Sequence, residues 1–270
     1  MKTTRNRPVS AVTIAMSDSA GGAGIQADLL TFAAHGVHAA SVLVAATAQS
    51  TLRITGIEPL SPAFIRRQMD AVFPDIRPAA VKIGALYDAA RIRVVAAGLA
   101  RHRAKNVVLD PVLAAKAGAS LLAPSAISSL LEELFPHCDL VTPNLPEAEA
   151  LAGIRIRDSA DKREAARVLA SFGCRAVLIK GGHAKGREVT DLFYDGHRFR
   201  EISHPRIRTR ATHGTGCTLS AAIAANLALG HGLESSVRRA IRYLGAGLER
   251  GIFPGRGWGV PDHFPGRRRS

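Results

Sequence analysis

The chain has few cysteines, few aromatic residues and no long hydrophobic run. Three cysteines, Cys138, Cys174 and Cys217, occur among 270 residues. Their odd number and unpaired spacing argue against a disulfide framework and fit a reducing compartment. The apolar stretch AVTIAM behind the basic N-terminus is too short for a signal-peptide core or a membrane span. We therefore expect a cytoplasmic protein without a membrane partner.

Acidic residues are also scarce, which leaves a formal net charge of +14, and 29 of the 36 basic residues are arginines. Such an excess can mark a nucleic-acid partner or an anionic substrate. The basic residues are dispersed, however, in short pieces such as RHRAK, PRIRTR and VRRAIR, without interleaved aromatic residues. A solvated arginine-rich surface is the favoured interpretation, and we expect no nucleic-acid partner.

Short apolar runs alternate along the chain with amphipathic stretches of helical length. The runs are bounded by Gly, Pro, Asn or Asp, as in strands buried on both faces, and read AVTIAM, AASVLVAAT, AAVKIGAL, NVVLDPVL, DLVTPN and AVLIKGG. The helical stretches are 22–36, 61–73, 88–102, 124–135, 159–173 and 216–230. This alternation predicts an α/β fold of three layers, in which helices cover both faces of a mostly parallel central sheet.

One segment departs from this alternation and predicts a hairpin. Residues 190–202 read TDLFYDGHRFREI, and two short strands that meet at a DG pair favour a tight antiparallel turn. We expect this hairpin as an antiparallel addition at one end of the sheet. The hydrophobic content of 47% suffices for one core, so we expect a single domain over residues 1–270, with flexible tails at about 1–9 and 264–270.

Two glycine-rich turns are candidate anion sites, because ligands of open α/β sheets bind beyond the carboxyl ends of the strands. The first, SDSAGGAGIQ, follows the first predicted strand and leads into a helix N-terminus, where free N–H groups favour an anion. A tight strand-to-helix turn needs the same small residues for steric reasons. This turn also lacks the lysine of a Walker A loop.

The second glycine-rich turn, HGTGCTLS, places a cysteine at a predicted helix start. The amides of Gly214, Thr215, Gly216 and Cys217 could face one concavity, which suits the charge on a phosphoryl group in transfer. A helix N-terminus can lower the pKa of a thiol from about 8.5 toward neutrality, and Cys217 would then be a base or a polar partner. A small buried residue that packs a helix start fits the spacing equally well. Cys138 and Cys174 lie beside apolar strands and are interpreted as core residues.

Three further loops supply charged or amide side chains behind predicted strands. Asp110 ends the strand in VLDPV, Asn144 and Glu147 surround a helix start in TPNLPEAEAL, and Lys180 precedes two glycines in LIKGGHA. Carboxylates near phosphates suggest magnesium, and a lysine beside glycines suggests a phosphate clamp. Each residue has an ordinary structural explanation, but their gathering at one end of one sheet favours a phosphoryl-transfer site.

These motifs closely resemble those of bacterial hydroxymethylpyrimidine and phosphomethylpyrimidine kinases, within the ribokinase-like superfamily. The resemblance covers nearly the whole chain and rests on SAGGAGIQADLLTF, VKIGAL, VVLDPVLAAKAG, VTPNLPEAEAL, LIKGGH, THGTGCTLSAAIA and GWGVPDHF. It implies a ribokinase-like homodimer that uses ATP and magnesium twice in one site. The first acceptor would be the hydroxymethyl group of a small aminopyrimidine, and the second would be the resulting monophosphate.

The resemblance also implies a role for each candidate residue. Gly214, Thr215, Gly216 and Cys217 would form the anion hole, and Cys217 takes the place of the aspartate base of many ribokinase-like enzymes. The other implied contacts are Asp110 and Glu147 for magnesium, Lys180, Asn144 and Gly182 for ATP, and Gln49, Asp28, Met16, Gly22, Ala85 and Val112 for the pyrimidine.

Gln49, expected after the second strand, bears on the choice of substrate. A carboxamide offers an acceptor and a donor side by side, and can pair with a 4-amino group and the adjacent ring nitrogen. Relatives that phosphorylate vitamin B6 compounds tend to carry another residue here, so Gln49 favours the pyrimidine over pyridoxal. A strand-end glutamine that faces water remains the structural alternative. The alternative functions are a pyridoxal or pyridoxine kinase and a non-catalytic nucleic-acid-binding or regulatory relative.

Four positions depart from the family pattern. Met16 stands where the family usually has glycine, and Ala85 stands where it often has methionine. We hypothesise that these two changes compensate, which keeps the volume of the pyrimidine pocket roughly constant. Ser50 and Ala117 stand where asparagine and serine are frequent, so the resemblance does not carry over the fine substrate contacts of these two positions.

Overall fold

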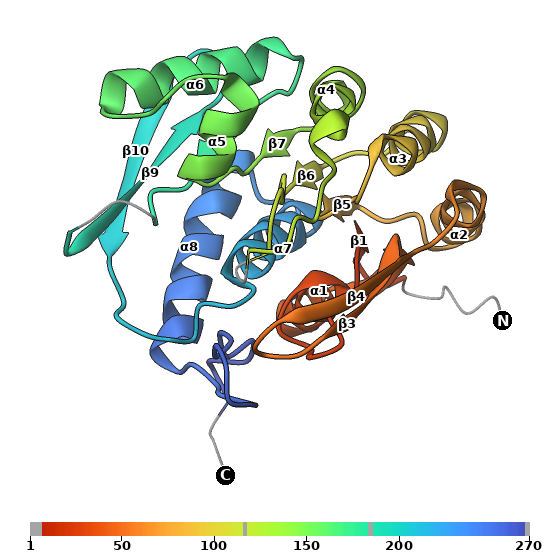
Figure 1. The fold of residues 1–270 in the computed structure, drawn as a ribbon, viewed down its shortest axis with the longest axis horizontal. Helices are drawn as coiled ribbons and strands as arrows, with labels where there is room; N and C mark the ends of the chain where they lie inside the picture. The colour runs from red at the N-terminus through yellow and green to blue at the C-terminus, as the bar shows by residue number, and fades with distance from the viewer. Residues whose placement is uncertain (1–6, 116–117, 183–185, 268–270) are drawn as a thin grey trace, which may run out of the picture.

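An eight-stranded sheet lies between two layers of helices in the computed structural model, which describes residues 7–115, 118–182 and 186–267 (Figure 1). The strands follow the spatial order β10 (Phe199–Pro205), β9 (Glu188–Tyr194), β8 (Val177–Ile179), β7 (Leu140–Val141), β6 (Val107–Leu109), β5 (Ala80–Ile83), β1 (Ser10–Ala15) and β2 (His38–Leu43). The pairs from β2 to β8 are parallel, whereas β9 is antiparallel to both of its neighbours. The predicted three-layer α/β fold and its antiparallel addition are confirmed.

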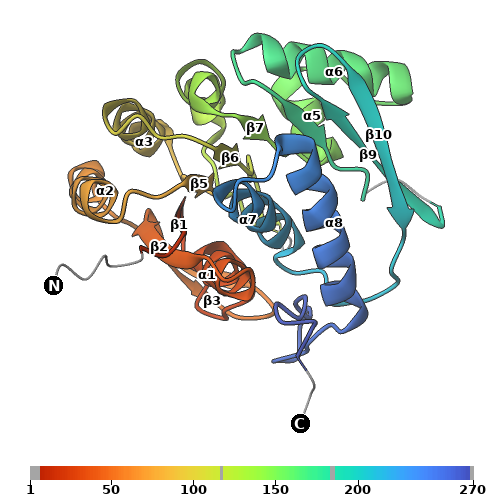
Figure 2. The ribbon, with the colours of Figure 1, turned by 180° about the vertical axis from the view of Figure 1, so that it is seen from behind.

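Helices cover both faces of this sheet. One face carries α1 (Gly24–Ala34), α7 (Thr215–Ala228) and α8 (Leu233–Glu249), which Figure 2 shows in front of the strands. The other face carries α2 (Pro62–Ile76), α3 (Ala89–Arg101), α5 (Leu145–Ala152) and α6 (Ser159–Ser171). The predicted helix over 124–135 forms four short consecutive turns, namely η1 (Pro124–Ala126), α4 (Ile127–Ser129), η2 (Leu130–Leu134) and η3 (Phe135–His137). None of the described helices is both long and apolar enough to cross a bilayer.

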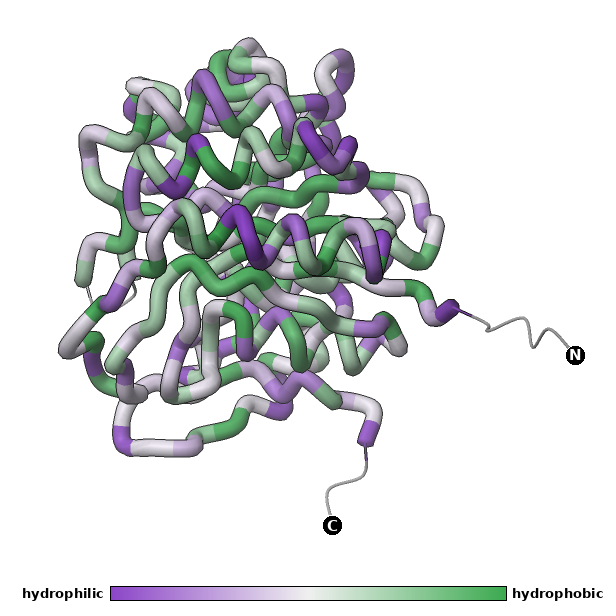
Figure 3. The backbone as a smooth tube through the Cα atoms, turned by 90° about the vertical axis from the view of Figure 1, so that its right-hand side faces the viewer, coloured by the Kyte–Doolittle hydropathy of each residue, from purple (hydrophilic) through white to green (hydrophobic). Residues whose placement is uncertain are grey.

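The strands separate two apolar cores, because alternate side chains of a strand point to opposite faces. Val12 and Ile14 of β1 belong to the core under α2 and α3, whereas Ala11 belongs to the core under α7 and α8. The green apolar segments run mainly through the interior and the purple hydrophilic ones lie mainly at the surface (Figure 3). Parallel strands with both faces covered therefore explain the continuous apolar runs of the sequence.

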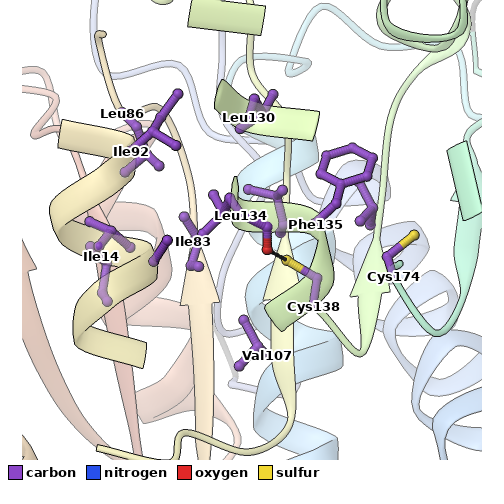
Figure 4. Close-up of a cluster of buried hydrophobic side chains, with 14 of the residues drawn as sticks. Ile14, Ile83, Leu86, Ile92, Val107, Leu130, Leu134, Phe135, Cys138 and Cys174 are labelled. Carbon is purple, nitrogen blue, oxygen red and sulfur yellow. Dashed lines mark hydrogen bonds between the residues drawn. The ribbon is translucent and has the colours of Figure 1, made fainter. Parts of the chain in front are cut away.

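Cys138 and Cys174 lie in the first of these cores, as predicted (Figure 4). The Cys138 thiol donates a hydrogen bond to the carbonyl oxygen of Leu134 at 3.3 Å. Burial raises the pKa of Cys174 to about 12, and it raises the pKa of Cys138 well above the ordinary value of a thiol. Both side chains are thus neutral packing residues.

A second hairpin, outside the main sheet, was not expected from the sequence. The apolar run 39–47 predicts one strand, but the chain leaves the sheet at Val44, and β3 (Ala45–Gln49) pairs with β4 (Ile54–Pro59) instead. The backbone N–H of Thr47 donates to Ser17 Oγ at 3.0 Å, and its hydroxyl donates to the Ser17 carbonyl at 2.9 Å. These bonds hold β3 against the loop behind β1, so Gln49 ends a strand of this small sheet.

The ends of the described chain are irregular. Residues 250–267 contain only an isolated bridge between Ile252 and Val260. The Arg267 N–H donates to the carbonyl of Phe264 at 3.0 Å, so residues 264–267 form a turn. The remaining parts of the two predicted tails, 1–6 and 268–270, lie outside the described residues, as does Ala117.

Candidate active site

A cavity of about 870 Å³ opens beyond the carboxyl ends of the parallel strands. Loops behind β1, β5, β6, β7 and β8 contribute to its wall, as the sheet topology requires. The sequence-predicted site residues in this wall are Met16, Gln49, Ala85, Asp110, Val112, Asn144, Glu147, Lys180, Gly182, Gly214, Thr215, Gly216 and Cys217. One cavity therefore gathers nearly all of the predicted site.

The N-terminus of α7 offers free backbone amides to this cavity. Gly214 is the N-cap residue, and within the described part of the chain no side chain caps the first turn. Its φ of +74° is a left-handed conformation that favours glycine, and a Cβ atom here would collide with the carbonyl oxygen of Gly22. The first N–H groups of a helix have no partner within the helix. The turn is therefore built to bind an anion.

Gly22, a predicted substrate contact, supports this turn from behind. It is not among the residues that line the cavity, and a Cβ atom on it would meet the ring of His213 and the side chain of Val260. Close approach of the Gly22 backbone thus requires glycine at 214, and the packed side chains of His213 and Val260 require it at 22. The structure thus places Gly22 behind the cavity wall, and its predicted substrate contact stays a prediction.

The thiol of Cys217 does not have the lowered pKa that its helix position predicts. Burial is the largest effect and raises the pKa of Cys217 to about 11, while the charge of Lys82 opposes the rise. Desolvation of the thiolate exceeds the benefit of the helix N-terminus and of the nearby cation. Cys217 is consequently a neutral thiol at pH 7, and the expected shift toward neutrality is wrong.

Asp28 lies behind the cavity wall and does not reach the cavity. Its fully buried Oδ2 accepts hydrogen bonds from Lys82 Nζ at 2.8 Å and from Thr13 Oγ1 at 2.6 Å. Among the residues that the structure describes, Asp28 Oδ1 has no hydrogen-bond partner. Burial is the largest single effect and lowers the pKa of Lys82, but the charges of Asp28, Cys217 and Asp110 and the hydrogen bond to Asp28 together raise the pKa above the ordinary value. The predicted substrate contact is therefore an internal counterion of Lys82, which itself lines the cavity.

A cluster of charges faces the anion-binding turn. Lys180 Nζ donates to Asp110 Oδ1 at 2.7 Å, and Thr142 Oγ1 lies 3.2 Å from the same oxygen. The other carboxylate oxygen, Oδ2, lies 2.9 Å from the position that a Cβ atom on Gly216 would take. Asp110 and Lys180 are thus next to the amides of α7, although they follow different strands.

Asn144 and Glu147 form the N-terminal capping box of α5. Asn144 Oδ1 accepts from the Glu147 N–H at 2.9 Å, and Glu147 Oε2 accepts from the Asn144 N–H at 2.8 Å. Burial raises the pKa of Glu147 to about 7, the charge of Asp110 adds to the rise, and Lys180 opposes it. Two carboxylates therefore share one region of the cavity with the ammonium group of Lys180.

Asp18 and His213 are cavity residues that the sequence analysis did not single out. His213 Nε2 lies 2.7 Å from Asp18 Oδ2, which joins the two glycine-rich turns across 195 positions of sequence. Burial raises the pKa of Asp18, but hydrogen bonds from His213 and from the backbone of Ala20 and Ala23 outweigh it, and the pKa is lowered. An aspartate ahead of one turn and a histidine ahead of the other were the only sequence signals.

The far end of the cavity holds another group that sequence reasoning missed. Asp191 accepts from the Gly181 N–H at 2.7 Å, and its hydrogen bond to His204 raises the pKa of that imidazole. Arg206 donates to the carbonyl of Gly182 at 2.9 Å. Apolar side chains also line the cavity, namely Ile207, Leu219, Ile241, Leu244 and Leu248.

A site of this architecture has known counterparts. The sequence model of the phosphomethylpyrimidine kinase family matches residues 18–262. The chain belongs to that family. It is therefore a kinase, and its three-layer fold is ribokinase-like.

Two curated relatives are similar to this chain over most of its length. The hydroxymethylpyrimidine/phosphomethylpyrimidine kinase of Bacillus subtilis is 43% identical over 261 residues, which cover 96% of each chain. The thiamine biosynthesis bifunctional protein ThiED of Geobacter sulfurreducens is 48% identical over 255 residues, or 94% of this chain. The chain spans 52% of the length of that bifunctional relative.

A solved structure of a pyridoxal kinase shares the fold. The enzyme from Staphylococcus aureus, in complex with AMP-PCP and pyridoxal, superposes with a TM-score of 0.86 at 30% identity. The match covers 95% of this chain and 93% of that one. The architecture of the phosphomethylpyrimidine kinase family is therefore shared with a kinase of vitamin B6.

Met16 and Ala85, two departures from the family pattern, meet in this cavity. Both are nearly buried, and they form one small apolar cluster with Ala45. Val112 packs against the same cluster. The side chains at 16 and 85 thus border one volume, which the compensation hypothesis requires.

Proposed function

We propose that this kinase transfers the γ-phosphoryl group of ATP to the hydroxymethyl group of 4-amino-5-hydroxymethyl-2-methylpyrimidine and then phosphorylates the monophosphate to the diphosphate. Both steps would belong to thiamine biosynthesis. The observation that carries the proposal is one cavity that joins the free amides of Gly214–Cys217, the ion pair of Lys180 with Asp110, and the carboxamide of Gln49. Amides and a lysine suit a transferring phosphoryl group.

ATP is the proposed phosphoryl donor. The pyridoxal kinase of similar fold binds AMP-PCP, a nucleotide, and Lys180, Asn144 and Gly182 line the cavity here. The apolar wall formed by α8 would accept the base, because a planar ring gains from burial against aliphatic side chains.

The carboxylates that line the cavity suit a magnesium ion that is also bound by phosphate oxygens. Among the described residues, no three His, Cys, Asp or Glu side chains gather into a cage for a metal. Asp110 and Glu147 nevertheless interact electrostatically and both line the cavity, and magnesium commonly uses one or two carboxylates with phosphate oxygens and water. These two residues would hold the ion, which would neutralise charge on the phosphates.

Different residues of the chain would act on different groups in the first step. The hydroxymethyl oxygen forms a bond to the γ-phosphorus, the bond from that phosphorus to the β,γ-bridging oxygen breaks, and ADP leaves. The amides of Gly214–Cys217 donate hydrogen bonds to the equatorial oxygens of the phosphoryl group, and Lys180 neutralises charge beside them. The alcohol proton can pass to Cys217 only when that residue is a thiolate, which its raised pKa makes a minor form at neutral pH.

Gln49 supports a pyrimidine as acceptor. Its carboxamide lines the cavity at the end of β3 and offers the adjacent donor and acceptor that an aminopyrimidine edge requires. A pyridoxal kinase on the same frame is the second candidate, and the fold shared with the Staphylococcus aureus enzyme is the observation that favours it.

Product analysis tests the proposal. The protein is incubated with ATP, Mg²⁺ and either the aminopyrimidine or pyridoxal, and the phosphorylated products are separated and quantified over time. We expect monophosphate and then diphosphate of the pyrimidine, with a higher kcat/KM than for pyridoxal. A higher kcat/KM for pyridoxal would overturn the proposal.

We further propose that residues 1–270 form a single domain of a cytoplasmic homodimer that binds no nucleic acid. The family resemblance supports the dimer, and the dispersion of the arginines supports the absence of a nucleic-acid partner. Sedimentation analysis measures the oligomeric state. Salt-sensitive binding of DNA or RNA without kinase turnover would favour the regulatory alternative instead.

A further inference from the structure

The carboxamide of Gln49 lies between an imidazole and a hydroxyl group. Gln49 Nε2 is 3.4 Å from His213 Nε2, and Gln49 Oε1 is 3.4 Å from Thr47 Oγ1. The same imidazole nitrogen is 2.7 Å from Asp18 Oδ2. All four side chains line the cavity. The surroundings of the amide therefore distinguish its oxygen from its nitrogen.

Hydrogen positions on both sides favour one orientation of this amide. Asp18 is an ionised acceptor, so His213 Nε2 carries a hydrogen and donates it toward Asp18. An amide nitrogen beside it brings a second donor against the first. On the other side, Thr47 donates its only hydroxyl hydrogen to the Ser17 carbonyl at 2.9 Å, which leaves lone pairs, not a hydrogen, for Gln49.

A half turn about the last carbon–carbon bond of Gln49 exchanges the two amide atoms and satisfies both neighbours. We propose that His213 is a positioning residue that, with Asp18 behind it, holds the Gln49 carboxamide with Oε1 toward the imidazole and Nε2 toward Thr47. The His213 Nε2–H is then shared between two oxygens, and Thr47 Oγ1 accepts from Gln49. The forward edge of the amide keeps one lone pair and one N–H for a ligand.

This orientation decides which way round the pyrimidine sits, an inference that rests on the proposed function. The 4-amino group pairs with Oε1 and ring nitrogen 3 pairs with Nε2. Along the ring, the hydroxymethyl group follows the amino group, and the 2-methyl group follows nitrogen 3. The hydroxymethyl group therefore lies on the side of His213, where the chain continues into the amides of Gly214–Cys217. The opposite amide orientation would direct the methyl group there.

Kinetics of His213→Ala in two backgrounds test the assignment. In the wild-type background we expect the dissociation constant of the aminopyrimidine, from calorimetry, to change less than about threefold, because the amide still pairs with the ring. We expect kcat to fall about tenfold, because part of the bound pyrimidine is reversed and the rest is less well aligned. In a Gln49→Ala background no amide is left to orient, so His213→Ala should lower kcat less than about twofold.

A second variant keeps the test valid if His213→Ala folds poorly. Thr47→Val removes the acceptor on the other side of the amide, and we expect the same separation of kcat from binding, again only when Gln49 is present. Equal losses of kcat with and without Gln49, for either variant, would overturn the assignment and leave His213 a structural link between the two turns. Wild-type turnover of the pyrimidine tests the proposed function by itself, so the two failures are distinguishable.

Discussion

Cys217 combines two opposed influences on a single thiol. The N-terminus of α7 and the charge of Lys82 favour a thiolate, and burial, which is the stronger effect, raises the pKa of Cys217 to about 11. The thiolate fraction below this pKa rises tenfold with each pH unit. If the thiolate accepts the alcohol proton, the first phosphorylation should accelerate with pH over about pH 7 to 9.

A comparison of the two acceptors distinguishes proton transfer by Cys217 from a purely steric role of its side chain. A hydroxymethyl group gains from deprotonation, whereas the monophosphate is already ionised near neutral pH. We expect Cys217→Ala to slow the first step by about 100-fold and the second by less than about tenfold, and to flatten the pH dependence of the first. Each step is measured alone by supplying its own acceptor. Equal losses in both steps would mean that the thiol only completes the ring of amides.

Met16 and Ala85 provide a test of volume in the acceptor site. Because both side chains border one apolar cluster, Met16→Gly should enlarge the pocket and raise the KM for the pyrimidine by about tenfold. Adding Ala85→Met to the same chain should restore most of the affinity. Initial rates of the two single variants and the double variant give the coupling. Independent effects would contradict the compensation hypothesis.

At the scale of elements, α7 contributes to the anion-binding part of the site through its N-terminal turn. An α-helix accommodates alanine at position 216. The added Cβ would, however, lie 2.9 Å from Asp110 Oδ2 and 3.3 Å from Lys180 Nζ. We expect Gly216→Ala to retain the free energy of unfolding and to lose about 100-fold in kcat, because the methyl group occupies space needed by the phosphoryl group.

Gly232→Ala is the matched control for this variant. It changes the N-cap residue of α8, where φ is −65° and no atom of the described residues lies within 4 Å of the added Cβ. Unfolding in urea and steady-state kinetics are measured for both variants. Similar activity of the two would show that the space beside Gly216 is not used in transfer.

The order of elements was predictable from the sequence, and their departures from the sheet were not. Buried parallel strands read as continuous apolar runs, and the pair DG marked the β9–β10 hairpin. The run 39–47 contains no break, however, since the bonds from Thr47 to Ser17 that lead β3 away are formed between distant residues. The expected helices also omit α8, although Leu233, Val237 and Ile241 recur there at helical spacing.

The site was predictable where a loop follows a strand, because topology alone brings such loops together. Asp28 was misplaced because its helix position does not reveal that its partner, Lys82, points inward from β5. His213 was missed because its importance depends on Asp18, at the other end of the chain. The pKa of Cys217 was misjudged since helix position is visible in a sequence and burial is not.

At the scale of the whole molecule, the ion pair of Lys82 with Asp28 joins α1 to the centre of the sheet. Both side chains are fully buried, so removal of one leaves the other charge unpaired in the interior. We expect Lys82→Met or Asp28→Asn to lower the free energy of unfolding by about 3–5 kcal/mol, and the double variant to cost less than the sum. Urea unfolding monitored by circular dichroism measures these changes.

An exposed pair serves as the control. Arg163 and Glu201 lie 3.1 Å apart with about half of each side chain exposed to solvent. Arg163→Met should change the free energy of unfolding by less than about 1 kcal/mol, because solvent screens such pairs. A loss at Lys82 no larger than the loss at Arg163 would contradict the internal role of the buried pair.

The hydrogen bond between Asp18 and His213 joins residues that the ribosome synthesises at different stages of translation. All strands of the main sheet precede residue 206 in the chain, so a ribosome that has synthesised residues 1–210 has produced the sheet and the first glycine-rich turn. The imidazole that orients Gln49 and the amides of α7 are not yet translated. We therefore expect a chain that ends at residue 210 to contain the strands of the sheet but to lack phosphoryl transfer.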